Sequence, residues 1–220
     1  METIIIQNVS IVLRGNMEPL TKILSASSEL FKQYGFKTIT MDDIARRAGI
    51  SKKTLYQHFA NKDEVVHETV VSYDDEKMNK CYQVVEGAVD AVEAMVKMMV
   101  MMDSMFKEIN PMAMFELRRF YPDTYTLFKD RLEKDDVGMM REMINRGISE
   151  GLFRKEINPD LMARLRLETA MMILQPNLLV NERNDLLSVS LEITEHFLYG
   201  IMNAKGIELY CKYKQQYLSK

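Results

Sequence analysis

The 220-residue sequence contains few of the residues that mark turns, metal sites and disulfides. It has no Trp, two Cys, three His, five Pro and nine Gly, against nineteen Met. So few turn-forming residues argue against a fold of many short strands, whereas Met, Leu, Glu and Lys favour helices. The composition therefore predicts an all-α protein.

Cysteine and histidine are too scattered to suggest a metal or redox centre. Cys81 and Cys211 show no CxxC or Cys/His spacing, so we expect reduced thiols and no zinc site. None of His58, His67 and His196 lies in an HExxH motif, and neither a nucleophile elbow nor a glycine-rich phosphate loop occurs. We therefore expect that the protein binds no cofactor and is not an enzyme. Catalysis would have to use chemistry that no local sequence motif marks.

Long apolar runs are also missing. No stretch reaches the roughly 18 apolar residues of a membrane span, so we expect a cytoplasmic protein without a membrane partner. Residues 1–16 have no cationic segment before Ile4, and Gln7 interrupts their apolar run, which disfavours a signal peptide. We expect a poorly ordered leader there, or a start at Met17. A minor-groove arm is the less favoured alternative, because Arg14 is its single cation.

Charge is distributed unevenly along the chain. Residues 17–62 carry eight Lys or Arg and four Asp or Glu, a balance of +4. Residues 1–16 are neutral, so the chain total of −3 leaves −7 for residues 63–220. An anionic polymer would therefore be attracted to the N-terminal third and repelled by the remainder.

Residues 40–62, TMDDIARRAGISKKTLYQHFANK, indicate two short helices joined by a sharp turn. Thr40 is a suitable N-cap, with Asp43 three residues later as in a capping box. Gly49 supplies the freedom that the turn needs, Ile50 is an apolar plug, and Ser51 caps the second helix. This combination favours a helix-turn-helix over an ordinary helical hairpin with a solvated, charged face.

The signature of the tetracycline-repressor (TetR/AcrR) family of DNA-binding regulators resembles this region. The resemblance spans roughly 45 residues, about a fifth of the chain, and rests on Gly35-Phe36, Thr38 to Thr40, Ile44-Ala45, Ala48 to Ser51, Thr54 to Tyr56, His58-Phe59 and Lys62-Asp63. It implies a homodimeric, ligand-responsive transcription regulator, most simply a repressor, bound to a double-stranded DNA operator. The effector would be a largely apolar small molecule. A helical interaction or carrier protein that retains the helix-turn-helix as scaffold is the alternative.

The resemblance also implies which residues contact DNA. Thr40 and Lys62 would touch phosphates. The groove-facing residues would be Ser51, Lys52, Lys53, Thr54, Tyr56, Gln57 and His58. Gln57 replaces a common aromatic residue and Lys53 a common small one, which leaves the operator sequence open.

Helical periodicity and breaks suggest how the chain is divided. We expect a helix-turn-helix domain at 17–63 and a helical regulatory and dimerisation domain at 64–220. Apolar spacing and turn residues predict helices at 18–34, from 62 to about 80, at 82–107, from 110, at 123–150, from 158 to a break at 175–176, from 185, and at 207–218.

Methionines recur on one face of the segment at 82–107. Such a stripe is most often core filler, but flexible thioethers can also line an adaptable pocket. The ligand-pocket candidates are Met95, Met98, Met99, Met102, Phe115, Phe120, Tyr125, Met143 and Met172.

The last two large helices are the candidates for a two-fold, four-helix interface, because members of the family pair in this way. The candidate interface residues are Leu165, Met172, Leu186, Val189, Ile193, Phe197 and Ile201. Packing within the chain alone is the alternative for the same faces.

Overall fold

The computed structural model describes residues 2–108, 110, 112–173 and 186–218, with the backbone alone at 2–17, 103, 106–108, 186 and 187. This part of the chain is almost entirely helical and contains one isolated bridge, between Phe153 and Met202. The helices are α1 Glu2–Tyr34, α2 Met41–Ala48, α3 Lys52–His58, α4 Lys62–Glu86, α5 Ala91–Glu108, α6 Ala113–Phe120, α7 Pro122–Arg131, α8 Val137–Ser149, α9 Pro159–Ile173, α10 Leu186–Ile201 and α11 Ala204–Tyr217, with a π-helical turn, η1, at Leu132–Asp136. The all-α prediction is confirmed.

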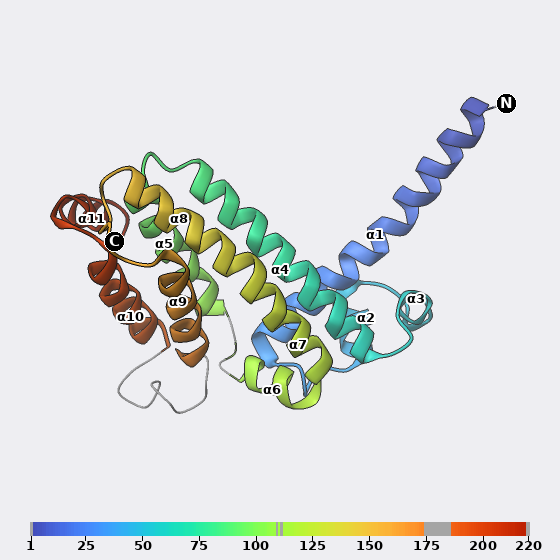
Figure 1. The fold of residues 1–220 in the computed structure, drawn as a ribbon. Coiled ribbons are helices and arrows are strands. Elements are labelled where there is room, and N and C mark those ends of the chain that lie inside the picture. The colour runs from blue at the N-terminus through green and yellow to red at the C-terminus, as the bar shows by residue number, and fades with distance from the viewer. Residues whose placement is uncertain (1, 109, 111, 174–185, 219–220) are drawn as a thin grey trace.

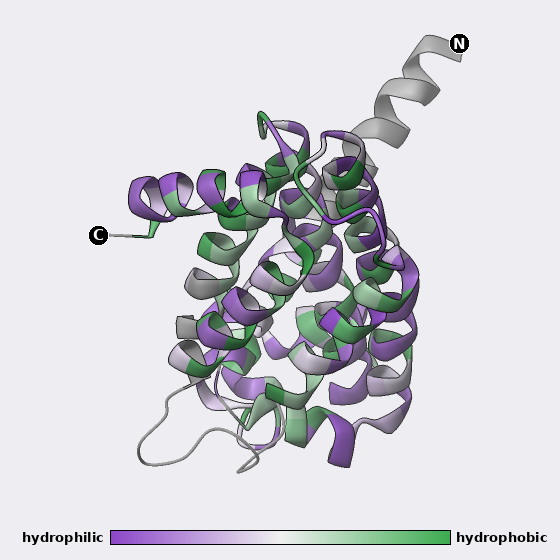
Figure 2. Ribbon diagram, turned by 60° about the vertical axis from the view of Figure 1, so that its left-hand side comes forward, coloured by the Kyte–Doolittle hydropathy of each residue, from purple (hydrophilic) through white to green (hydrophobic). Residues whose placement is uncertain are grey.

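The helices pack around two hydrophobic cores. The first joins α1, α2 and α3 to the start of α4 and to α6; the second joins the end of α4 to α5, α8, α9, α10 and α11. Hydrophobic and hydrophilic stretches alternate along the helices in Figure 2, as expected for amphipathic helices with one face in a core. In Figure 1, α3 and α11 lie at opposite ends and α4 runs between them. The long helix α4 therefore belongs to both cores.

The first core extends past the expected domain boundary at residue 63. Val65 and Val66 of α4 are fully buried in it, and Ala113 and Leu117 of α6 are also members. A backbone hydrogen bond also joins the segment before α6 to α1, because Asn110 N–H donates to the carbonyl of Lys32 at 2.7 Å. The helix-turn-helix is thus built with side chains from the C-terminal part of the chain.

Helix boundaries differ from the predicted ones at several places. Helix α1 begins at Glu2, so the backbone of residues 2–16 is continuous with the helix expected at 18–34. The segment expected at 123–150 is divided by η1 into α7 and α8. The expected break at 175–176 lies outside the described residues.

The break expected near residue 81 lies instead at residues 87–90. Asp90 caps α5 by accepting a hydrogen bond from Glu93 N–H at 2.8 Å, and the Glu93 carboxylate accepts one from Val89 N–H at 2.7 Å. These two bonds form a capping-box arrangement, with the acid reaching one residue further back than usual. Arg146 donates to the carbonyls of Val85 and Ala88 at the end of α4. The Asp-x-x-Glu spacing at Asp90 and Glu93 is the sequence signal that marks this break.

Candidate nucleic-acid interface and ligand cavity

Helix α2 is held at both ends by the residues that the sequence suggested. Thr40 Oγ1 accepts a hydrogen bond from Asp43 N–H at 3.2 Å, and Thr40 N–H donates to Asp43 Oδ2 at 3.0 Å. The Thr40 hydroxyl also donates to Asp43 Oδ2 at 2.6 Å, and the hydrogen bonds from the Thr40 hydroxyl and N–H to this carboxylate hold the pKa of Asp43 below its ordinary value. At the other end, Gly49 adopts a left-handed conformation with φ 67°. The chain can therefore turn directly into the second helix.

Helix α3 presents one face inward and one outward. Ser51 Oγ accepts a hydrogen bond from Thr54 N–H at 3.0 Å, while Leu55 and Phe59 are buried in the first core. The opposite side is exposed and carries Lys52, Lys53, Tyr56 and Gln57. Thr54 and His58 are half-buried at its edges. This two-turn helix has polar groups suited to phosphates and base edges on its free side.

The polar groups of this face are not equally available. Lys52 Nζ lies 2.7 Å from an Asp42 carboxylate oxygen, and this pairing raises the pKa of Lys52. Thr40 and Ser51 use their hydroxyls in the helix caps. Within the described part of the chain, Lys53 and Gln57 are exposed and form no hydrogen bond or ion pair. They are therefore the residues freest to contact DNA.

Lys62 lies differently from what the family resemblance implied. It is half-buried at the start of α4, and its ammonium donates to the carbonyl of Phe36 and, at 3.4 Å, to that of Lys37. Burial lowers the pKa of Lys62, partly offset by the nearby carboxylates of Glu116, Asp63 and Asp43. In this structure the ammonium is directed to the chain between α1 and α2, and a phosphate would have to compete with those carbonyls.

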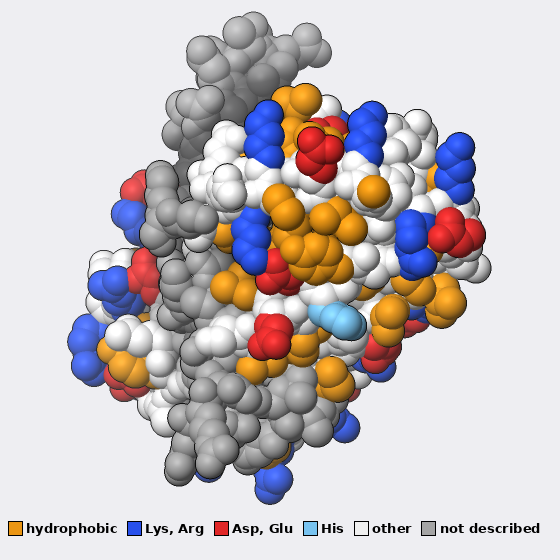
Figure 3. Space-filling model, turned by 90° about the vertical axis from the view of Figure 1, so that its left-hand side faces the viewer, with side chains coloured by type: hydrophobic (Ala, Val, Ile, Leu, Met, Phe, Trp, Pro, Cys, Tyr) orange, Lys and Arg blue, Asp and Glu red, His pale blue; other side chains and the backbone are white. Residues whose placement is uncertain are grey.

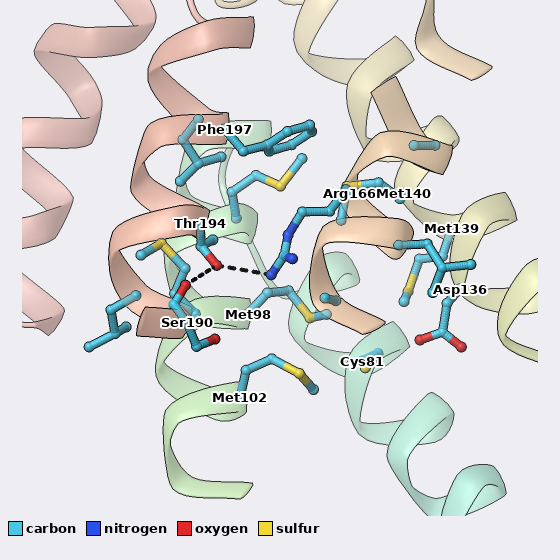
Figure 4. Close-up of a pocket in the computed structure, with 17 residues that line it drawn as sticks. Cys81, Met98, Met102, Asp136, Met139, Met140, Arg166, Ser190, Thr194 and Phe197 are labelled. Atoms are coloured by element: carbon cyan, nitrogen blue, oxygen red, sulfur yellow. Dashed lines mark hydrogen bonds between the residues drawn. The ribbon is translucent and has the colours of Figure 1, made fainter. Parts of the chain in front are cut away.

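A cavity of about 130 Å³ lies in the second core, between α5, α8, α9 and α10. Six methionines contribute to its wall: Met95, Met98, Met99 and Met102 of α5, with Met139 and Met140 of α8. The polar lining consists of Asp136, Arg166, Ser190 and Thr194 (Figure 4). The cavity is thus mostly apolar, with a few polar groups at fixed places, as is typical of small-molecule sites.

Two charged groups of the lining have different surroundings. Asp136 is hydrogen-bonded to Lys77 Nζ at 3.0 and 3.1 Å, and burial nevertheless raises its pKa. Arg166 Nη2 donates to Thr194 Oγ1 at 2.9 Å, and Thr194 in turn donates to the Ser190 carbonyl at 2.7 Å. Within the described part of the chain, Arg166 Nη1 is buried without a hydrogen-bond partner.

Comparison with known proteins identifies the N-terminal unit. The model of the bacterial regulatory proteins of the tetR family matches residues 23–69, which include α2, α3 and the start of α4. Over these residues the chain is similar to the DNA-binding unit of the TetR/AcrR regulators. Its helical fold and its helix-turn-helix agree with this similarity.

The similarity to known regulators extends beyond the matched unit. It is 26% identical over 156 residues to the HTH-type regulator YvaF of Bacillus subtilis, covering 70% of this chain and 80% of YvaF. It is 24% identical over 151 residues to the repressor KstR2 of Mycobacterium tuberculosis, covering 67% and 76%. The structure of FadR of Bacillus subtilis in complex with stearoyl-CoA superposes on this chain with a TM-score of 0.63 at 16% sequence identity. The superposition covers 83% of this chain and 99% of FadR, so the two proteins share a fold.

The pocket candidates from the sequence separate into two groups in the structure. The four methionines of α5 line the cavity. Phe115 and Phe120 are exposed on α6, and Tyr125 packs against the first core, because α6 and α7 cover the helix-turn-helix unit. Met143 is a buried member of the second core, and Met172 is half-buried on α9; neither lines the cavity.

The dimer candidates also fall on different faces. Phe197 lines the cavity and Ile201 is 1% exposed, so both pack within the chain. Val189, Ile193 and Met172 are half-buried, and the side chain of Leu186 lies outside the described residues. Exposed apolar side chains of these helices are Leu161 and Leu165 of α9 and Tyr199 of α10. Hydrophobic side chains gather near the centre of the face on the α10 and α11 side of the molecule (Figure 3).

The sequence interpretation missed most of the polar cavity residues, including Arg166. A signal for Arg166 existed, because it shares a helical face with Ala163, Leu167 and Ala170, and an arginine on an apolar face is unusual. No comparable signal marked Asp136, since its position depends on the π-helical turn. In the described residues, no group of three or more His, Cys, Asp or Glu could hold a metal ion, and no helix is long and apolar enough to cross a membrane.

Proposed function

We propose that this protein is a homodimeric repressor that binds a palindromic DNA operator and is released when a small molecule enters the Met-lined cavity. The observation that carries the proposal is the geometry of the capped helix α3. Leu55 and Phe59 are buried in the first core on its inner side, and Lys53 and Gln57 are exposed on its outer side. The naming of KstR2 as a repressor and the acyl-CoA bound to FadR support the proposal by similarity.

Helix α4 is the proposed connection between the two sites. Its first turn packs in the core under α3, and its Lys77 pairs with Asp136, which lines the cavity. Asp74 of α4 joins the same cluster, accepting from Arg131 Nε of α7 at 2.7 Å. A ligand that moves Asp136 would therefore act on α4 through buried charge contacts, which are strongly distance-dependent.

A second contact joins α6 to the helix-turn-helix. Glu116 Oε2 accepts a hydrogen bond from Lys37 N–H at 2.9 Å, in the chain between α1 and α2. A Cβ at Gly35, which has φ 79°, would come within 2.6 Å of the same oxygen. This close approach holds α6 against the end of α1, so that movement of α6 would also be transmitted to α2 and α3.

Small movements suffice for regulation. Two recognition helices of a rigid dimer must enter successive major grooves about 34 Å apart, and a change in their separation spoils the match. A coupling free energy of about 1–3 kcal/mol gives roughly a 5- to 150-fold change in affinity. The ligand must bind the two conformations with different affinity for any shift to occur.

Selection of bound sequences from a random duplex pool tests DNA recognition. A palindrome with half-sites about one helical turn apart is the expected result. Recovery of no preferred sequence, together with no retention on random DNA at low salt, would contradict the proposal and favour a carrier or interaction protein.

Sedimentation of two matched variants tests the dimer. Leu165→Lys places a charge on the exposed face of α9, whereas Val89→Lys does so at an 81% exposed position between α4 and α5. We expect Leu165→Lys to sediment as a monomer and to lose affinity for the palindrome, and Val89→Lys to behave as the parent. A dimer that survives Leu165→Lys would exclude this face of α9 as the interface.

A further inference from the structure

We propose that the cavity binds a small monocarboxylic acid with an apolar body, and that its carboxylate pairs with Arg166. The inference rests on the proposed function, because it names the chemical class of the effector for that cavity. It comes from an imbalance of charge in the lining and from the shape and composition of the wall.

Arg166 is half-buried, and its guanidinium has no counter-ion among the described residues. One terminal nitrogen donates to Thr194, while the other, Nη1, is shielded from solvent and has no protein partner. Burial alone lowers the pKa of Arg166 to about 10, with no carboxylate acting against it. Buried charges are costly unless they are paired, so an anion that enters the cavity would remove an existing penalty.

The surroundings of Arg166 favour one negative charge over two. The only other charged residue that lines the cavity within the described part of the chain is Asp136, and its carboxylate is already paired with Lys77. Figure 4 shows Arg166 and Asp136 on different sides of the site, with Thr194 and Ser190 beside the guanidinium. One unpaired guanidinium balances one carboxylate, and its planar fork fits two carboxylate oxygens.

The wall defines the remainder of the ligand. The six methionines are flexible and apolar, so they can fit around an aliphatic chain or a ring. The volume of about 130 Å³ is close to that of an apolar cavity of roughly 150 Å³ that holds benzene. A body of about that size fits without rearrangement, and rotation of methionine side chains would admit a longer chain.

Calorimetric titration of the full chain at pH 7.5 tests the assignment with sodium octanoate and octan-1-ol as probes. These molecules have the same chain length, and only octanoate is charged. We expect octanoate to bind at least tenfold more tightly than octanol. Arg166→Met should lower the affinity for octanoate at least tenfold and leave that for octanol unchanged, because the apolar wall remains.

Arg164→Met is the matched control. Arg164 lies on the same helix but is exposed and pairs with Glu133 on the surface, so its replacement should leave both affinities unchanged. Arg166→Lys keeps the charge without the fork, and should bind octanoate between the parent and Arg166→Met. It also serves as the second variant if Arg166→Met does not fold.

Several outcomes would overturn the assignment. Equal affinity of the parent for octanoate and octanol would do so, as would unchanged octanoate binding in Arg166→Met. Tighter binding of octyl phosphate than of octanoate would refute the single-charge argument. Failure of octanoate to bind would end this proposal alone if the same sample still binds duplex DNA, whereas loss of DNA binding as well would count against the proposed function.

Discussion

The ammonium group of Lys62, at the start of α4, donates a hydrogen bond to the carbonyl oxygen of Phe36, in the chain that connects α1 to α2. This bond joins the helix that reaches the cavity to the segment that leads into the DNA-binding helices. Because its ammonium is directed to this carbonyl, Lys62 links two segments within the N-terminal unit. Lys53, on the exposed side of α3, is the cation better placed for a phosphate.

Replacement of these two lysines should therefore have different effects. Lys62→Met should lower the free energy of unfolding by about 1 kcal/mol, because a partly buried carbonyl loses a charged donor. Lys53→Met should leave stability unchanged and should reduce the slope of log K against log salt by about one. Urea denaturation and salt-dependent DNA titrations measure the two effects. A flattened salt slope in Lys62→Met without loss of stability would restore a phosphate-contact role for Lys62.

The sequence predicted the helix-turn-helix well because its information is local. Thr40, Asp43, Gly49 and Ser51 each act on residues at most four positions away, so their spacing alone defines the caps and the turn. The direction of the Lys62 side chain could not be predicted in this way, since its acceptor is 26 residues distant.

The cavity was only partly predictable for the same reason. A methionine stripe on one helix indicates an apolar face, and the α5 face does line the cavity. Which helix lies opposite depends on the tertiary packing, and so Phe115 and Tyr125 were assigned to a site from which they are distant. The regular spacing of the interface candidates from Leu186 to Ile201 in α10 likewise identifies an apolar face, but it could not decide whether Phe197 meets this chain or a second copy.

Lys77 should be one of the most sensitive positions for stability. Its ammonium lies 2.7 Å from Asp74 and 3.0 Å from Asp136, and Asp74 is 1% exposed. Lys77→Met leaves two carboxylates with one partner fewer in a buried place, so we expect a loss of about 3–5 kcal/mol in the free energy of unfolding. Lys52→Met, which breaks the exposed pair with Asp42, should shift the urea midpoint far less. Equal shifts in the two variants would show that the Lys77 cluster is solvated in solution.

The capping box at Thr40 should contribute to stability in a pH-dependent way. Thr40→Ala should cost about 1 kcal/mol, as is usual for an N-cap. The pKa of Asp43 is lowered in the folded chain, so its contribution is present above the unfolded value near 3.8 and is lost as the pH falls through the folded value. The difference in stability between the parent and Asp43→Asn, measured by thermal unfolding, should therefore be largest at neutral pH and shrink below about pH 4. A difference that is constant over this range would refute the role of the ionised carboxylate.

Gln57 should affect which sequence is bound more than how tightly DNA is bound overall. Its amide is exposed on α3 and can both donate to and accept from a base edge, as in pairing with adenine. Gln57→Ala should cost about 1–3 kcal/mol on the preferred operator and little on random duplex. Selection from a random pool with the variant should show relaxed preference at one position of each half-site. Equal losses on specific and random DNA would instead place Gln57 against the backbone.

The two cysteines provide a test of the cavity that needs no knowledge of DNA. Cys81 lines the cavity, and burial raises the pKa of its thiol to about 11, whereas Cys211 is exposed on α11. Because the thiolate is the reactive form, iodoacetamide at pH 8 should label Cys211 first and Cys81 much more slowly. Mass spectrometry of Cys211→Ser, which leaves Cys81 as the single thiol, should show labelling that slows further when octanoate is added. Fast labelling of Cys81 in the folded chain, or a rate insensitive to every cavity ligand that binds by calorimetry, would mean that the thiol is reached from outside the cavity.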